Sequence, residues 1–558
     1  MKKTLYLLFG FLMSLQVVMA QKAISGTVTG GDTGGPLVGA SIAVKGTTQG
    51  TFADTDGKFT IDLPTGNDVL VISFIGYETK EVAVGNQSNI NVTLNVGNEL
   101  EEVVVIGYTS QRKEDLTGSV AVVEMKPIKN NSSGNVMQAM QGRVPGLYIE
   151  KDGSPNGSNS RILIRGANTL GNNDPLYIID GIPTTRPEVF QNLNPATIES
   201  VQVLKDASAQ SIYGARASNG VIIVTTNNGG NTNGKVAFQF NSSIAAQSEK
   251  SMRFDMLNSV DRGRALWQAS VNDLQDPAAG YGDIYDFNWN NDFSNPVLTS
   301  VTPKPFVGGD PNTPSGDTDW QDVLFKTGIV TQNDLTASYG NSNSSIEINF
   351  GHLKNTGMIQ NTGYDRLSGS INALTRAFDD KVRFGTNLRV ANSNETLTAR
   401  DLGGASSTFL AVTLAPTIPV YQSDGVTFAG ASGAGYSDRN NPLHMQHIAR
   451  WNNTNRLSAF GNAFLEIQPI KNLFFKSNIG ADNNTFVSKV ITPTFSEGAF
   501  NRTTNSLSFD QNKFLSTTWS NTLRYDWDLD SKNNFKFLVG TEFIKTDLDF
   551  QFTRKETK

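Results

Sequence analysis

The feature that most constrains the fold is a stretch late in the chain in which apolar and polar residues alternate. Within residues 518–529, the large apolar side chains fall on odd positions and polar ones on even positions: Trp519, Leu523, Tyr525, Trp527 and Leu529 against Ser520, Thr522, Arg524, Asp526 and Asp528. A period of two is the pattern of a β-strand with two unlike faces. An outer face rich in aromatic residues and a polar inner face are typical of a transmembrane β-barrel. We therefore expect the apolar set to face lipid and the polar set to face a lumen.

The same alternation recurs elsewhere, which predicts a sheet of such strands. Further apolar sets are Val382, Phe384, Leu388 and Val390, and Phe535, Phe537, Val539 and Phe543. Short polar turns join neighbouring strands at residues 340–344, 379–380 and 530–534, whereas long polar loops occupy residues 248–330 and 393–451. Short turns at one end and long loops at the other are typical of outer-membrane barrels. A soluble β-sandwich would also alternate, but it would not need this asymmetry.

The number of strands predicts an incomplete barrel over residues 235–558. The pattern gives roughly nine strands, whereas a plugged outer-membrane transporter has about 22. The sequence also ends on polar residues without an aromatic strand end. We expect this part to be the first strands of a transmembrane antiparallel β-barrel from a longer protein. Expressed alone, such an open sheet should aggregate, because its edges are unsatisfied in hydrocarbon.

The first 20 residues predict export. Lys2 and Lys3 precede an apolar run at residues 5–15, and Ala20 and Gln21 follow a small-residue stretch suited to cleavage between them. This is the organisation of a secretory signal peptide. The apolar run is too short for a transmembrane helix, which needs about 20 apolar residues.

Residues 21–98 predict a β-sandwich, and residues 99–110 a linker. The sandwich has short β-type runs separated by Gly, Asp and Pro turns, at residues 24–28, 41–44, 58–63, 69–74, 78–84 and 90–94. In the linker a β-branched run follows an acidic residue: Glu102, Val103, Val104, Val105, Ile106 and Gly107. The residues alone favour an ordinary edge strand of a neighbouring domain. The alternative is a mobile strand that adds to a partner's sheet through main-chain hydrogen bonds.

Residues 111–228 predict a compact α+β unit. Its strands are Leu176–Ile179, Ile198–Leu204 and Val221–Thr226, with a short helix at residues 206–213 and another at residues 135–141. The last strand is apolar without alternation, which is typical of a central strand buried on both faces. Arg161, Arg165, Arg216 and Asp180 are expected to pair with each other or with the barrel wall rather than with solute.

Three groups of motifs carry a resemblance to a known family. The stretches LYIIDGIP, IESVQVLKDASAQSIYGARASNGVIIVTT and GRVPGLYI…ILIRGAN resemble the plug domain of TonB-dependent outer-membrane transporters, closest to the SusC/RagA-like branch. The motif residues in this plug are Ile179, Asp180, Gly181, Tyr213, Gly214, Arg216 and Gly220. Residues 24–61 resemble the carboxypeptidase-regulatory-like sandwich that precedes such plugs, without peptidase chemistry. Residues 317–341 and 415–426 resemble the start of a SusC-like barrel.

The resemblance implies a function and a set of partners. It implies energised import of an oligosaccharide or a peptide across the outer membrane of a Gram-negative bacterium, by a plug that gates a barrel. It places a TonB box at residues 102–107, contrary to the edge-strand interpretation. The implied partners are TonB with its inner-membrane motor proteins, a SusD-like surface lipoprotein, the solute and the lipid bilayer. The alternative is a surface-binding receptor that does not transport.

Composition and motifs argue against other classes of function. The formal charge is −6, which argues weakly against nucleic acid as a partner. The chain has no cysteine and three histidines, of which His444 and His447 lack a third ligand nearby in the sequence, so we expect no metal site and no cofactor. No nucleophile elbow, phosphate loop or dinucleotide fingerprint is recognisable, and we expect no enzyme activity. The expected fold is mainly β: a sandwich, an α+β plug and the first barrel strands.

Overall fold

The computed structural model describes most of the chain, divided into two compact units. The described residues are 22–557 except for 33, 46, 48, 64–68, 75–76, 86, 96–102, 107–108, 113–119, 124, 130–133, 151–153, 155–159, 207–210, 249–252, 401–403, 437 and 530–532. Ala20, Gln21, Glu102 and Gly107, at the predicted cleavage site and box, lie outside them. Within the described part, no helix has both the length and the apolar character needed to span a membrane.

The N-terminal unit is the expected β-sandwich. One sheet has the order β4 (Lys58–Leu63), β1 (Lys22–Gly30), β7 (Asn89–Leu94), and the other has the order β3 (Gly50–Phe52), β2 (Ser41–Val44), β5 (Val69–Ser73), β6 (Lys80–Ala83). Buried and exposed residues alternate along β4 and β7, so each strand gives one side chain in two to the core. Ile24, Ile42, Leu70, Ile72 and Leu94 lie at its centre. Strand β3 was not predicted.

The second unit begins with the plug, by which we mean residues 120–228. Its sheet has the order β10 (Val120–Val123), β15 (Ile198–Leu204), β16 (Val221–Thr226), β13 (Leu176–Ile179), β14 (Ile182–Thr184), beside a hairpin of β11 (Leu147–Glu150) and β12 (Arg161–Ile164). The helices are α2 (Met125–Lys129), α3 (Val136–Met140) and α4 (Pro187–Gln191), with 3-10 turns η2 (Pro195–Thr197) and η3 (Ser211–Ala217). The sequence predicts a helix at residues 206–213. In the described part of this range the structure instead has a 3-10 turn, which begins at Ser211 and runs beyond Tyr213.

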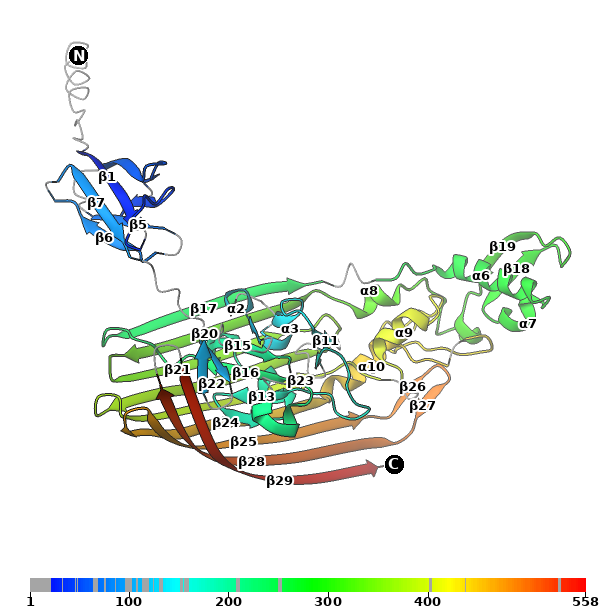
Figure 1. Ribbon diagram of the computed structural model, residues 1–558. Helices are drawn as coiled ribbons and strands as arrows, with labels where there is room; N and C mark the ends of the chain where they lie inside the picture. Colours follow the sequence, from blue (N-terminus) through cyan, green and yellow to red (C-terminus); the bar gives the residue numbers. More distant parts are fainter. Residues whose placement is uncertain are drawn as a thin grey trace, which may run out of the picture. The chain divides into compact units, whose positions relative to one another are not determined.

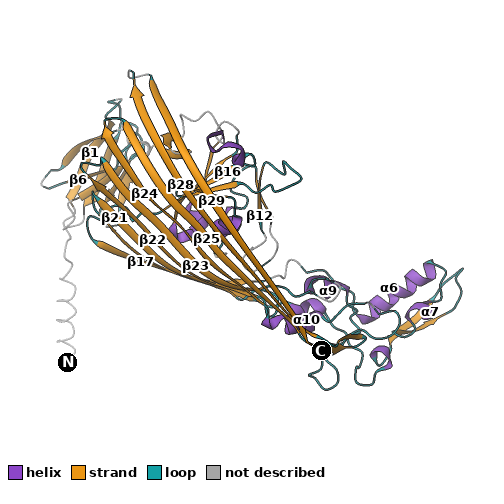
Figure 2. Cartoon of the chain, turned by 90° about the horizontal axis from the view of Figure 1, so that it is seen from below, coloured by secondary structure: helices purple, strands orange, loops and turns teal. Residues whose placement is uncertain are grey.

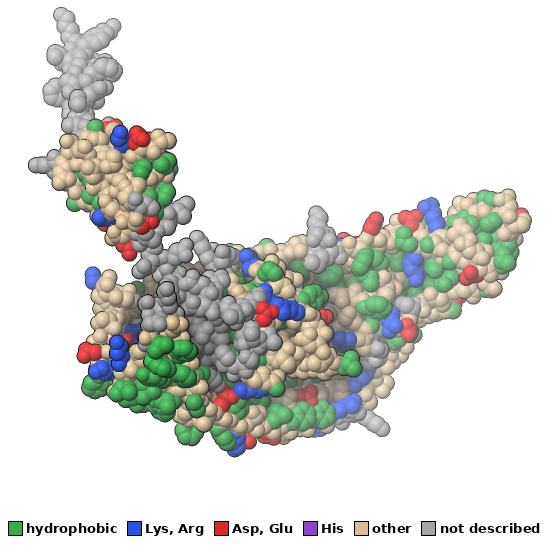
Figure 3. Space-filling model, viewed as in Figure 1, with side chains coloured by type: hydrophobic (Ala, Val, Ile, Leu, Met, Phe, Trp, Pro, Cys, Tyr) green, Lys and Arg blue, Asp and Glu red, His purple; other side chains and the backbone are tan. Residues whose placement is uncertain are grey.

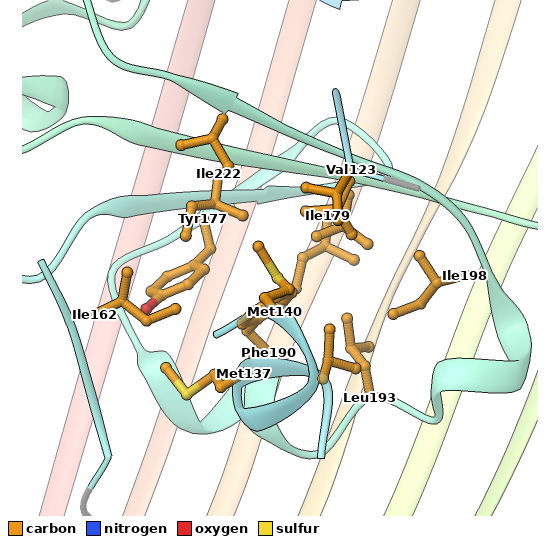
Figure 4. Close-up of a cluster of buried hydrophobic side chains, with 14 of the residues drawn as sticks. Val123, Met137, Met140, Ile162, Tyr177, Ile179, Phe190, Leu193, Ile198 and Ile222 are labelled. Carbon is orange, nitrogen blue, oxygen red and sulfur yellow. The ribbon is translucent and has the colours of Figure 1, made fainter. Parts of the chain in front are cut away.

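Strand β16 is central and buried on both faces, as its unalternating sequence predicts. Tyr177, Ile179 and Ile222 face one cluster, together with Met137, Met140 and Phe190 from α3 and α4 (Figure 4). Val221 and Ile223 face a second cluster on the other side. Asn135 caps α3 by accepting a hydrogen bond from the Met137 backbone N–H at 2.8 Å, which fixes where this helix begins.

The rest of the second unit is built on a large antiparallel sheet, which we call the wall. In the described residues it has nine strands, as predicted: β17 (Val236–Gln247), β20 (Gly328–Gly340), β21 (Ser344–Asn355), β22 (Gly363–Ala377), β23 (Val382–Thr396), β24 (Asn453–Ile470), β25 (Leu473–Thr492), β28 (Asn505–Asp528) and β29 (Asn534–Thr557). Each strand pairs with the next one in this order (Figures 1 and 2). The plug lies against one face of the wall.

The two faces of the wall have the predicted character. Trp519, Leu523, Tyr525 and Trp527 of β28 are 40–53% exposed on the outer face, whereas Ser520 and Thr522 are buried on the plug side. Outward apolar residues also run along β23 and β29: Phe384, Leu388, Val390, Phe535, Phe537, Val539 and Phe543. Apolar side chains gather where β28 and β29 approach their shared turn (Figure 3).

The long loops are more ordered than the sequence indicated. The loop after β17 holds α6 (Ser259–Asn272), α7 (Pro277–Tyr281), the hairpin β18 (Tyr285–Trp289) and β19 (Leu298–Pro303), η4 (Val307–Gly309) and α8 (Trp320–Leu324). The loop after β23 holds α9 (Ser407–Thr413), α10 (Pro442–Ile448) and η5 (Ala449–Trp451), and β26 (Phe495–Glu497) and β27 (Phe500–Arg502) follow β25. These elements gather at one end of the wall (Figure 2), around cores of their own.

Candidate functional site between plug and wall

The motif Ile179-Asp180-Gly181 forms a tight turn of the plug. Asp180 and Gly181 have φ angles of 48° and 84°, and Ile179 pairs with Ile182 across them. A two-residue hairpin with both central residues in the left-handed region favours Asp-Gly, because Asp tolerates that region and Gly has no Cβ to hinder it. The turn between β13 and β14 therefore follows from the sequence.

The side chain of Asp180 joins this turn to the wall. Its carboxylate accepts hydrogen bonds from the backbone N–H and the hydroxyl of Thr226, both at 2.9 Å, at the end of β16. It also forms an ion pair with Arg389 of β23, and the Asp180 and Arg389 side chains are 8% and 10% exposed. Nδ2 of Asn462 on β24 donates to the Asp180 carbonyl at 3.5 Å. The motif aspartate is thus an anchor, as the expected pairing with the wall predicts.

A second anchor is a chain of alternating charges that the sequence analysis missed. Arg186 of the plug lies 3.7 Å from Asp482 of β25 and 3.7 Å from Glu188, which lies 3.7 Å from Arg456 of β24. The Thr184 hydroxyl donates to Asp482 at 3.1 Å. Burial lowers the pKa of Arg186, and the carboxylates of Asp482 and Glu188 oppose this shift. No local signal pairs residues so far apart in the sequence.

Hydrogen bonds that are not part of an ion pair form a third group of anchors, on strands β20, β21 and β22 of the wall. Nδ2 of Asn194 donates to Asp334 of β20 at 2.5 Å and to Asn349 of β21 at 3.0 Å. Arg366 of β22 is 3% exposed and donates to the carbonyl oxygens of Leu193 and Gly134 at 3.5 and 3.4 Å. Separate polar contacts therefore join the plug to many strands of the wall, and Phe460 of β24 packs into the main core of the plug.

The remaining motif residues of the plug have structural roles: Tyr213, Gly214, Arg216 and Gly220. Tyr213 is buried against the second plug cluster, and Gly214 has φ 68°, which breaks η3. Gly220 has φ 98°, and a Cβ there would lie 2.5 Å from Ile164 Cδ1. Arg216 pairs with Glu542 of β29 at 2.5 Å.

The other two arginines of the expected group stay within the plug. Arg165 pairs with Asp206 at 2.5 Å. Arg161 lies near Asp174, and it partly offsets the rise in the pKa of Asp174 that burial causes. Of the four residues expected to pair, Asp180 and Arg216 contact the wall.

The predicted box is a strand in a small sheet of its own. Val103–Ile106 forms β8, which pairs with β9 (Thr109–Arg112). Neither strand belongs to the sheets of the sandwich or of the plug. The edge-strand interpretation, in which this run completes a neighbouring domain, is therefore wrong. Its role as a TonB box stays a prediction.

The loop histidines serve packing in the described structure. His444 of α10 pairs with the buried Glu497 of β26, and its ring stacks on Phe428 at 4.5 Å. Glu497 also accepts from the Asn441 backbone N–H at 2.6 Å. Burial lowers the pKa of His447, and Arg450 and His444 add to this shift. Among the described side chains, no three potential metal ligands of the His, Cys, Asp or Glu type cluster.

Comparison with known proteins agrees with this architecture. Residues 112–221 match the TonB-dependent Receptor Plug Domain, and residues 24–105 match the CarboxypepD_reg-like domain. The TonB-dependent receptor SusC of Bacteroides thetaiotaomicron is 32% identical over 83% of this chain and 41% of its own length. The TonB-dependent receptor P26 of Formosa agariphila is 29% identical over 94% of this chain and 49% of its own length.

A solved structure shares the fold. The RagAB peptide importer in its open-open state superimposes with a TM-score of 0.62 and 26% identity, over 82% of this chain and 50% of the solved chain. The chain thus spans half or less of the length of these relatives. It is homologous to the SusC-type TonB-dependent receptors and has a regulatory-like domain, a TonB-dependent receptor plug domain and a large antiparallel sheet.

Proposed function

We propose that this protein imports a solute across the bacterial outer membrane, driven by TonB. The observation that carries the proposal is the way the plug is held: a folded unit with its own core rests on the wall through separate polar anchors, such as Asp180–Arg389. Polar contacts of this kind can hold the plug against the wall and can still be broken, because polar groups that separate can form hydrogen bonds to water. A continuous apolar interface would lose its whole burial energy on opening.

The predicted box supplies the point of attachment for the motor. A strand can add to another sheet through main-chain hydrogen bonds, and β8 lies between the sandwich and the plug in sequence. In the proposed mechanism, TonB and its inner-membrane motor proteins bind residues 102–107 and pull on the chain that leads into β10. The plug then loses part of its contact with the wall, and solute passes into the periplasm.

The outer side of the protein is proposed to bind the solute with a lid. The loop elements α6 to α10 and the hairpin β18–β19 gather at one end of the wall, away from the short turns. We propose that a SusD-like surface lipoprotein covers this end, and that the outward apolar face of the wall contacts lipid. The solute class is an oligosaccharide or a peptide. The peptide alternative is supported by a structural relative that is named a peptide importer, and the oligosaccharide alternative rests on the resemblance of the sequence motifs to the SusC-like branch.

The proposal is tested by uptake in cells that carry the gene. Tritiated oligosaccharides from a mixed polysaccharide hydrolysate and tritiated peptides from a protease digest serve as separate probes. Uptake of one probe that requires both the gene and TonB is the expected result. Binding without internalisation would instead support the alternative, a surface receptor that does not transport. Failure of both probes to bind would contradict the proposal.

A further inference from the structure

Two charged residues of the plug and two of the wall form a row of alternating charges, which we call the charged row. Nη1 of Arg186 lies 3.7 Å from Oδ1 of Asp482 on β25. Oε1 of Glu188 lies 3.7 Å from Nη1 of Arg456 on β24. Within the plug, Nε of Arg186 also lies 3.7 Å from Oε2 of Glu188. Each plug residue of the row therefore has one opposite charge on the wall and one on the plug itself.

The spacing within the charged row is wider than in the main ion pair of the plug. Arg389 donates a hydrogen bond directly to the carboxylate of Asp180, whereas the three separations of the row exceed the usual length of a hydrogen bond. Nη1 of Arg186 and Oδ1 of Asp482 are buried, and neither has a hydrogen-bond partner among the described residues. Arg186 is therefore shared between its two neighbouring carboxylates and is bonded to neither.

Both arginines of the charged row lie over aromatic rings of the wall. Cζ of Arg186 is 4.3 Å from the centre of the Phe514 ring on β28, and Cζ of Arg456 is 5.4 Å from the centre of the Phe486 ring on β25. A ring face attracts a guanidinium without fixing which N–H group meets which acceptor. Arg186 can therefore turn from the carboxylate of the wall to the carboxylate of the plug during the first part of a separation, while it stays on its ring.

The arrangement limits the number of unpaired charges when plug and wall separate. Arg186 and Glu188 leave together and can then pair with each other, because both belong to the plug. On the wall, Asn484 lies on the same face of β25 as Asp482, two residues away. Its Nδ2 is buried and has no partner among the described residues. This amide can donate to the carboxylate that the arginine leaves.

We propose that Arg186 and Glu188 form an exchange latch, by which one side of the plug leaves the wall while its charges stay paired. In the seated plug, Arg186 is shared between wall and plug, and in the released plug it pairs with Glu188 alone. The Asp180–Arg389 pair has no such exchange, because its two charges lie on opposite sides of the contact. The plug should therefore part from β24 and β25 before it parts from β23. The latch is a property of plug attachment and is measured without reference to import.

The experiment removes the two carboxylates that share Arg186, singly and together. Asp482→Asn, Glu188→Gln and the double variant are prepared in membranes from cells that carry the intact gene. The rate at which a protease cleaves the plug is measured at one fixed urea concentration, and the fragments are identified by mass. Glu542→Gln, alone and combined with Glu188→Gln, is the matched control, because among the described residues Arg216 has this carboxylate as its one ion-pair partner.

Each single variant should speed cleavage by less than about threefold, because Arg186 keeps one of its two carboxylates. The double variant should speed cleavage by about thirtyfold or more, which exceeds the product of the single effects, because the arginine is then left without a partner. The effect of Glu542→Gln should be the same with and without Glu188→Gln.

A further variant separates the latch from a general loss of folding. Arg186→Met, added to the double variant, removes the cation that has lost both partners, and slow cleavage should return. If the double variant does not reach the membrane, the same substitution should restore the amount that does. The proposal is overturned if Asp482→Asn alone is as severe as the double variant, if the single effects simply multiply, or if Arg186→Met gives no rescue.

Discussion

Asp180 and Arg389 form an ion pair between two parts of the molecule that are 209 residues apart in sequence, and both side chains are about nine-tenths buried. The aspartate comes from a tight turn of the plug, and the arginine comes from the middle of β23. Because Asp180 also accepts two hydrogen bonds from Thr226, the pair links three elements: the turn, the end of β16 and the wall. Four predictions follow from this and related features.

Replacing Arg389 should loosen the plug. Arg389→Ala leaves a buried carboxylate without its cation, and removing one partner of such a pair costs about 3–5 kcal/mol. The plug should become protease-sensitive at a lower urea concentration. Arg383→Ala is the matched control on the same strand, because Arg383 is 40% exposed and its ion pairs, with Asp380 and Glu466, lie within the wall and do not involve the plug. Equal urea midpoints for the two variants would contradict the anchor.

The centre of the plug sheet should not accept a charge. Ile223 is 2% exposed in β16, and Ile223→Asp would bury a carboxylate without a partner, at a cost of several kcal/mol. We expect little folded plug in circular dichroism or proteolysis of the membrane-bound protein. Leu170→Asp, at a fully exposed plug position, should fold like the parent. A folded Ile223→Asp plug would show that β16 is not the core strand.

The box should depend on its main-chain donors. Val104→Pro with Ile106→Pro removes two N–H groups from β8, and we expect energised uptake to fall to background while solute binding is retained. Val104→Ala with Ile106→Ala keeps both N–H groups and should retain most of the uptake. Uptake that persists in the proline variant would place the TonB contact elsewhere.

Gly220 should be required for a steric reason that Gly171 does not share. At Gly220 the backbone has φ 98° and an added Cβ would lie 2.5 Å from Ile164, whereas at Gly171 the nearest atom is 3.5 Å away and φ is ordinary. Gly220→Ala should therefore destabilise the plug by about 1 kcal/mol or more, because strain and overpacking add. Gly171→Ala should be neutral. Urea titration of both variants measures the difference.

Local patterns in the sequence were sufficient to predict the central plug strand and the long strands of the wall, but not short strands such as β3. The unalternating run Val221–Thr226 gave the central plug strand, and the odd and even positions of residues 518–529 gave the two faces of β28. The turn at Asp180 follows from Asp-Gly chemistry. The contacts that anchor the plug to the wall were harder to predict. The partner of Arg186 is Asp482, for example, and no local periodicity in the sequence links these two residues. Of the four residues expected to pair with each other or with the wall, Asp180 and Arg216 contact the wall.

The loops were the least predictable part. Residues 248–330 and 393–451 look polar in sequence, yet Trp267, Trp320 and Leu410 are buried in small cores there. Isolated apolar residues in a polar segment carry no clear period, so only tertiary contact shows that they pack together. The short β8–β9 sheet is a similar case, since a four-residue strand can pair with either neighbour or with its own continuation.

The length of β28 has a consequence for where solute is first captured. The strand has 24 residues, whereas about 9–11 suffice to cross hydrocarbon. With a rise of about 3.3 Å per residue and a tilt of about 45°, its 24 residues rise roughly 55 Å along the membrane normal, about 25 Å more than a hydrocarbon core of about 30 Å. Charges on lipid headgroups are screened within about 10 Å. In the proposed membrane placement, a solute that reaches the loop end of this strand would therefore be captured beyond the electrostatic influence of the membrane surface.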